Sequence, residues 1–187
     1  MTHAQDIPCQ DQVTGYLLGD ADEAGKQFLF NLTGIDLSKR LLGRSDLEQF
    51  NPQRGDMAQL DGIVWKSDDL TQAIGVRNVG ENEFWVPGHF PGKPLFPGVL
   101  MVEASAQLAG YCYNARFDEP KLAAFLKIEN TTFRSAVVPG DTLFLLLKEV
   151  SFSMRRFCSD VQGVVNNRIA FETRVSGLKL PDPFPGQ

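Results

Sequence analysis

Residues 94–115 form an almost uncharged segment that any fold of this chain must bury. Glu103 is its only acidic or basic side chain. Proline and glycine at its start favour a helix over about residues 98–114, and its polar side chains and prolines argue against a membrane span. A helix that is apolar nearly all round must be covered on most sides. A lone carboxyl inside it costs free energy unless something pairs or uses it.

Strand patterns occupy most of the chain on both sides of this helix. Apolar alternation and apolar runs predict strands over residues 62–65, 71–79, 123–128, 142–151, 157–165 and 169–178. Four prolines between residues 86 and 97 predict an irregular loop before the helix. Asn166-Asn167 predicts a tight hairpin turn. The expected fold class is therefore α+β, a curved antiparallel sheet wrapped around one long central helix.

The start of the chain reads as a prefix to this domain. We divide the sequence into a prefix of unassigned role, residues 1–44, and a domain, residues 45–187. Residues 36–42 have the pattern of a short amphipathic helix. Ser45 and Glu48 have the spacing of a capping box, which predicts a second short helix starting there.

Composition narrows the classes of function. A chain of 187 residues, 43% hydrophobic, can bury a real core. The formal net charge of −5 argues against a nucleic-acid binder. The cysteines Cys9, Cys112 and Cys158 show neither a disulfide framework nor a zinc pattern. The acid–base chemistry described below requires no metal and no cofactor. The N-terminus lacks the pattern of a signal peptide, and we expect a cytoplasmic protein.

A histidine and a carboxyl stand out as candidate catalytic groups. His89 lies in the proline-rich loop, which limits its backbone freedom, whereas His3 lies near the terminus. The loop leads into a helix whose first N–H groups, at Gly98 and Val99, favour a developing negative oxygen. Glu103 follows about one and a half turns later. A base, oxyanion donors and an acid can together remove a proton next to a carbonyl and expel a neighbouring hydroxyl.

The stretch PGHFPGKPLFPGVLMVEASAQ, residues 87–107, resembles the signature of the 3-hydroxyacyl-[acyl-carrier-protein] dehydratases of bacterial fatty acid synthesis. That signature is His-Phe-Pro, a short spacer, Pro-Gly-Val-Leu, two residues, then Glu-Ala-x-Ala-Gln. Residues 137–141, after Phe133, are similar to a later strand-turn motif of the family. The resemblance runs over roughly residues 51–178 and implies a hot-dog fold. Glu103 stands where related isomerase-type dehydratases carry aspartate, which favours the plain dehydratase branch.

The resemblance implies a lyase that dehydrates 3-hydroxyacyl-carrier-protein thioesters to trans-2-enoyl thioesters. His89 would take the proton from C2, Glu103 would help the 3-hydroxyl depart as water, and the Gly98 N–H would bind the thioester oxygen. The acyl chain would run in an apolar tunnel, with Phe90 and Phe96 as candidate lining residues. In the family, the His and Glu of one site come from different subunits. A homodimer would therefore be required, and trimers of such dimers also occur.

Further contacts follow from the same resemblance. Val99 and Gln107 are candidates for substrate binding, although Gln107 could equally satisfy a buried backbone group. The acidic acyl-carrier protein would favour basic residues near the mouth of the site. The candidates are Arg134, Arg155, Arg156 and Arg168.

The sequence also departs from the family pattern. The family has a Pro-His-Arg segment and then an apolar run, whereas this chain has Pro52-Gln53-Arg54 and a run broken by Gly55, Asp56 and Gln59. This departure is expected to change the shape of the tunnel end or the subunit contact, but not the proton chemistry. Two alternatives stay open: a hot-dog thioesterase that hydrolyses the acyl thioester, and a non-catalytic acyl-binding or assembly module.

Overall fold

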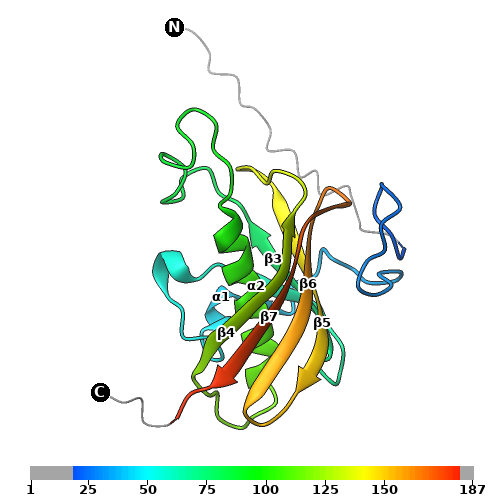
Figure 1. Cartoon of the computed structure of the whole chain (residues 1–187), viewed down its shortest axis with the longest axis vertical. Helices are drawn as coiled ribbons and strands as arrows, with labels where there is room; N and C mark the ends of the chain where they lie inside the picture. Colours follow the sequence, from blue (N-terminus) through cyan, green and yellow to red (C-terminus); the bar gives the residue numbers. More distant parts are fainter. Residues whose placement is uncertain (1–18, 182–187) are drawn as a thin grey trace, which may run out of the picture.

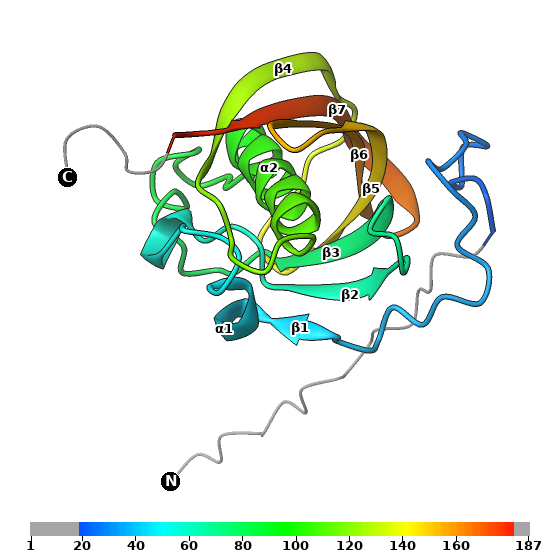
Figure 2. The same ribbon diagram turned by 90° about the horizontal axis from the view of Figure 1, so that it is seen from below.

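One antiparallel sheet curves around one long helix in the computed structural model, which describes residues 19–181 (Figures 1 and 2). The helix, α2, spans Gly98–Asn114, and a short helix, α1, spans Arg44–Leu47. The sheet has the strand order β1-β2-β3-β5-β6-β7-β4. Its strands are β1 Leu42–Gly43, β2 Gly62–Lys66, β3 Gln72–Asn78, β4 Ala123–Phe133, β5 Thr142–Phe152, β6 Arg156–Val165 and β7 Arg168–Lys179. The predicted α+β hot-dog class is confirmed.

Strand β5 shows how the sheet separates two cores. Its side chains alternate across the sheet. Leu143, Leu145 and Leu147 join the core around α2, while Phe144 and Leu146 join a second core on the opposite face. Because both faces are buried, the strand reads as a continuous apolar run rather than an alternating one.

The second core is closed by residues 19–41, which we call the N-terminal strap. The strap lies on the side of the sheet opposite α2 (Figures 1 and 2). Phe28, Leu32 and Leu37 are buried there against the outward-facing side chains of the sheet. Burying each such side chain typically stabilises a fold by about 1.5–3 kcal/mol. The described part of the prefix therefore covers the sheet.

Two expectations for this region are corrected by the structure. The helix predicted over residues 36–42 is wrong: the segment forms turns, and the Asp36 carboxylate accepts hydrogen bonds from the Ser38 N–H and hydroxyl at 3.0 and 2.6 Å. The predicted second short helix exists, but its capping carboxyl belongs to Asp46, which accepts the Gly43 N–H at 2.8 Å. β1 spans Leu42–Gly43, and the division of the chain into a prefix and a domain stays a prediction.

The elements flanking the site match the sequence patterns closely. α2 begins and ends at the predicted residues, with Pro97 as its N-cap. The β6–β7 turn is formed by Asn166 and Asn167, both with positive φ, as expected for a tight hairpin. Across residues 19–181, no helix is both long enough and apolar enough to span a bilayer.

Candidate active site

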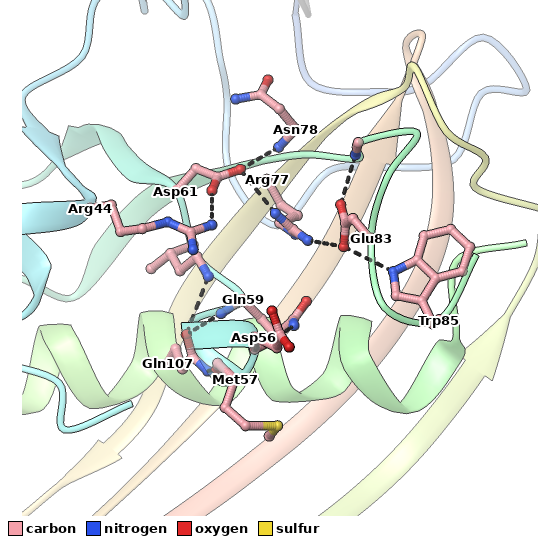
Figure 3. Close-up of polar contacts among 12 residues, drawn as sticks. Arg44, Asp56, Met57, Gln59, Asp61, Arg77, Asn78, Glu83, Trp85 and Gln107 are labelled. Carbon is pink, nitrogen blue, oxygen red and sulfur yellow. Dashed lines mark hydrogen bonds and ion pairs between the residues drawn. The ribbon is translucent and has the colours of Figure 1, made fainter. Parts of the chain in front are cut away.

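A network of charged groups fixes the start of the loop that carries His89 (Figure 3). Arg77 of β3 is buried and forms ion pairs with Asp61, at 3.4 Å, and with Glu83. Arg44 of α1 pairs with the other oxygen of Asp61. The Glu83 carboxylate also accepts the indole N–H of Trp85 at 2.9 Å. Removing one partner of such a buried pair typically costs about 3–5 kcal/mol, so the network anchors the loop firmly.

His89 is held by backbone groups on both sides. Its N–H donates to the carbonyl oxygen of Trp85 at 2.8 Å, and its ring Nδ1 lies 2.8 Å from the carbonyl oxygen of Leu95. A carbonyl oxygen can only accept, so Nδ1 carries the hydrogen and Nε2 of the neutral ring keeps its lone pair. Phe90 stacks on the imidazole, with ring centroids 4.3 Å apart. The arrangement presents an oriented base.

The first turn of α2 has unpaired backbone donors. The N–H groups of Leu100 and Met101 donate to the Pro97 carbonyl, at 2.9 and 3.2 Å. For the N–H groups of Gly98 and Val99, no acceptor is found within residues 19–181. The oxyanion role of these two groups stays a prediction.

Gly98 also has a packing reason to be glycine. A Cβ at this position would lie 2.6 Å from the ring of Phe133 on β4, a contact that side chains do not make. The glycine therefore lets an aromatic ring of β4 cover the helix start, and its presence alone does not distinguish packing from catalysis.

Glu103 is held through one of its two carboxylate oxygens. Oε1 accepts a hydrogen bond from the Gln107 side-chain amide at 2.8 Å and one from the Gln53 side-chain amide at 3.3 Å. Oε2 accepts none from the described part of the chain, and it is not among the buried unpaired atoms. One oxygen is thus fixed by amides while the other stays available for proton transfer.

Gln107 uses both ends of its amide inside the protein. Its Oε1 accepts the backbone N–H groups of Gln59 and Leu60 at 2.9 and 3.2 Å (Figure 3). Its Nε2 donates to the Met57 carbonyl at 2.6 Å and to Glu103. The amide has no free hydrogen bond for a substrate. Gln107 therefore positions Glu103 and holds the turn in which the family's apolar run is interrupted.

Gln53 is the site residue that the sequence reasoning missed. It was noted only as a departure from the family's Pro-His-Arg segment. The signal that could have found it is its position in that segment, but its contact with Glu103, fifty residues later, arises only in the folded chain.

A pocket runs along α2 beside these groups. Its lining is Asn51, Pro52, Gln53, Ala106, Gln107, Gly110, Asn114, Ala123, Ala124, Phe125, Phe157, Val175 and Ser176. The two proposed tunnel residues lie elsewhere within the single chain. Phe90 is half-exposed on the loop, and Phe96 is buried between Trp85 and Arg77. Their contact with an acyl chain stays a prediction.

The two catalytic candidates do not meet within one chain. His89 and Glu103 have separate hydrogen-bond partners, and no described contact joins them.

The Cys112 thiol is fully buried, and this burial raises its pKa to about 12, which makes it an inert apolar side chain. Residues 19–181 contain no group of three or more His, Cys, Asp or Glu side chains placed to hold a metal ion.

Comparison with known proteins adds to this geometry. The sequence model of the FabA-like domain matches residues 51–174. The 3-hydroxyacyl-[acyl-carrier-protein] dehydratase FabZ of Agrobacterium fabrum is 34% identical over 79% of this chain and 97% of its own length. FabZ of Acetivibrio thermocellus is 35% identical over 72% of this chain and 92% of its own length. The bifunctional enzyme LpxC/FabZ of Porphyromonas gingivalis is 38% identical, but the match covers only 28% of that longer enzyme.

Solved structures support the fold at much lower identity. The dehydratase heterocomplex ApeI:P from Xenorhabdus doucetiae aligns with a TM-score of 0.62 at 14% identity, over 73% of this chain and 91% of the other. A sigma28-regulated virulence protein from Campylobacter jejuni aligns with a TM-score of 0.55, also at 14% identity. The alignment covers 74% of this chain and 88% of the other. The matched domain, and relatives that are about one-third identical over nearly their whole length, show that this chain belongs to the FabA-like family of 3-hydroxyacyl-[acyl-carrier-protein] dehydratases.

Proposed function

We propose that this chain catalyses the dehydration of 3-hydroxyacyl-carrier-protein thioesters to trans-2-enoyl thioesters in fatty acid biosynthesis. The observation that carries the proposal is that the chain provides both an imidazole oriented as a base, His89, and, apart from it, a carboxyl fixed through one oxygen, Glu103. The relatives named as FabZ dehydratases support the same reaction. A cytoplasmic location is part of the proposal.

The reaction needs only groups that the chain provides. Nε2 of His89 takes the proton from C2, and the electron pair of that C–H bond moves into the thioester to give an enolate with a negative oxygen. Collapse of this enolate forms the C2–C3 double bond. The C3–O bond breaks as Glu103 gives its proton to the departing hydroxyl, which leaves as water. Because Oε1 of Glu103 already accepts two N–H groups, the transferred proton resides on Oε2. The N–H groups of Gly98 and Val99 stabilise the negative thioester oxygen, a donor of this kind being worth roughly 3–4 kcal/mol.

The active site is completed by a second copy of the chain. β4 lies at one end of the sheet and pairs with β7 along one edge only. The exposed apolar side chains on β4 are Phe125, Leu126, Ile128 and Phe133, and the exposed Val99 follows Gly98, which Phe133 covers. An unpaired edge with such side chains is suited to pairing with another strand. A two-fold dimer through β4 would cover this surface and bring His89 of one subunit toward Glu103 of the other; trimers of such dimers stay a prediction.

In this proposal, the acidic acyl-carrier protein is bound by basic residues that are not already neutralised by an ion pair. Of the four candidate basic residues, Arg134 and Arg168 form ion pairs with Glu172 and Glu23. Arg155 and Arg156 are exposed, and neither has an ion-pair partner within residues 19–181. Two cations without an ion-pair partner among the described residues are better placed to bind acidic groups than two that are already neutralised.

The reaction is tested by mixing the protein with a 3-hydroxyacyl thioester and recording enoyl absorbance and free thiol. We expect enoyl formation without thiol release. His89→Ala and Glu103→Gln should each lower turnover by at least about a hundredfold, the lower end of general acid–base contributions, with unchanged circular dichroism. Thiol release by the wild-type protein would instead identify a thioesterase. Binding of the carrier without any turnover would identify a non-catalytic module.

A further inference from the structure

Gly110 lies inside α2 at a position where the surrounding chain does not require glycine. A glycine within a helix lowers stability relative to alanine because the unfolded chain gains more freedom. A Cβ at Gly110 would meet only the side-chain oxygen of Asn51, at 3.5 Å, which is an ordinary van der Waals contact. Gly98 in the same helix differs, because a Cβ there would collide with Phe133. Packing within the chain explains Gly98 but not Gly110.

Gly110 lines the pocket that runs along α2. Glu103, Ala106 and Gly110 follow one another at spacings of three and four residues, so they share one face of the helix. All three are partly exposed, whereas the residues between them are almost all buried. Gln53 connects the pocket to the acid, since it lines the pocket and donates to Glu103.

Two side-chain amides that line the pocket have their donors satisfied within the chain. The Asn51 side-chain amide donates to the Gln107 carbonyl at 2.9 Å, and the Asn114 amide donates to the Phe50 carbonyl at 2.7 Å. These donors are satisfied by the backbone, so a hydrocarbon chain beside them leaves no donor newly unpaired. Ala123, Ala124 and Val175 contribute apolar wall on the sheet side.

We propose that Gly110 sets the length of acyl chain that the enzyme accepts. The inference rests on the proposed function, in which C3 of the substrate lies at Glu103 and the rest of the chain extends along α2. Gly110 is seven residues beyond Glu103, about 10 Å along the helix axis. Short acyl chains end before this point, whereas long chains pass over it. The missing side chain leaves space for the distal part of a long chain, and helix stability is lower as a consequence.

The test compares wild type, Gly110→Ala and Ala106→Val with 3-hydroxyhexanoyl and 3-hydroxydodecanoyl thioesters. Gly110→Ala should raise the melting temperature by about 2–4 °C and lower kcat/KM for the dodecanoyl substrate at least about tenfold. Its kcat/KM for the hexanoyl substrate should stay within about twofold. Ala106→Val lies one turn nearer the acid and should impair both substrates. The affinities for the saturated hexanoyl- and dodecanoyl-coenzyme A, measured by calorimetry, should follow the same order.

Two results would overturn the inference: equal losses for both chain lengths in Gly110→Ala, or no loss for the dodecanoyl chain. Failure of the proposed function is a separate result, in which wild type forms no enoyl product from either substrate. The calorimetric affinities need no turnover, so they decide the role of Gly110 in that case as well.

Discussion

At the scale of single residues, the proposed acid, Glu103, is held by two side-chain amides at unequal distances. Gln107 approaches Glu103 more closely than Gln53 does, at 2.8 against 3.3 Å. Gln107 also holds two backbone N–H groups, so its removal disturbs the fold around it. The Gln53 side chain makes no other hydrogen bond among the described residues. It therefore allows the positioning of Glu103 to be tested separately from stability.

We predict that Gln53→Met lowers kcat about three- to tenfold, since a hydrogen bond typically contributes about 0.5–1.5 kcal/mol and this one helps to orient Glu103. KM should stay within about twofold, because the substrate does not contact the lost N–H groups in this account. Steady-state kinetics gives both values. Gln49→Met, at an exposed glutamine, is the matched control and should change neither. A rise in KM with unchanged kcat would contradict the positioning role.

The sequence identified some of these residues but not their supports. His89 and Glu103 could be found because the motif around them is contiguous and because an isolated carboxyl in an apolar helix is conspicuous. The carbonyl groups of Trp85 and Leu95 that orient His89 carry no side-chain signal, and their approach depends on how the proline-rich loop folds back.

At the scale of elements, the N-terminal strap depends on polar contacts as well as on its apolar side chains. Glu172 of β7 pairs with Lys26 of the strap and with Arg134. Gln162 of β6 accepts the Leu29 N–H at 2.9 Å and donates to Glu172 at 3.1 Å. The strap is thus joined to the sheet partly by an ionised carboxylate.

The pKa of Glu172 gives this junction a dependence on pH. Partial burial acts to raise its pKa, but hydrogen bonds from Lys26, Arg134 and Gln162 outweigh burial and hold it below the ordinary 4.5. A carboxyl whose pKa is lowered by folding stabilises the protein above the unfolded value. That contribution is lost as the pH falls below about 4.5 and through the folded value.

We therefore predict that Glu172→Gln lowers the melting temperature at pH 7 and flattens its decline on acidification. Thermal unfolding followed between about pH 7 and pH 3 measures both effects. Glu23→Gln is a suitable control, because Glu23 forms a more exposed pair with Arg168 and should change the curve little. Curves for Glu172→Gln and wild type that stay parallel down to low pH would exclude this role for Glu172.

How well elements could be predicted follows from their periodicity. α2 and six of the strands have strong apolar patterns, so their positions were predicted to within a few residues, except for the longer β4. The apolar residues of the strap have no regular spacing. Its three buried side chains could not be recognised as core residues without the sheet on which they pack. Its segment 36–42 looked helical for the same reason, since a short amphipathic pattern does not specify which structure buries it.

At the scale of the whole molecule, the proposed dimer depends on the exposed edge strand β4. We predict that Ile128→Lys, which places a charge on this exposed strand, converts a dimer into a monomer with little turnover. Sedimentation should give about twice the chain mass of 20.7 kDa for wild type and the chain mass for the variant. Leu41→Lys changes an equally exposed apolar residue on the strap and should stay dimeric. An active monomer of Ile128→Lys would exclude a shared site.

The measurement that tests the shared site most directly is complementation between two inactive variants. His89→Ala and Glu103→Gln are co-expressed with different tags, and the mixed dimer is compared with each parent for enoyl formation. If each site takes His89 from one subunit and Glu103 from the other, every mixed dimer has one intact site. A random mixture should then recover on the order of a quarter of the wild-type rate. A mixed dimer no more active than its parents would contradict the account.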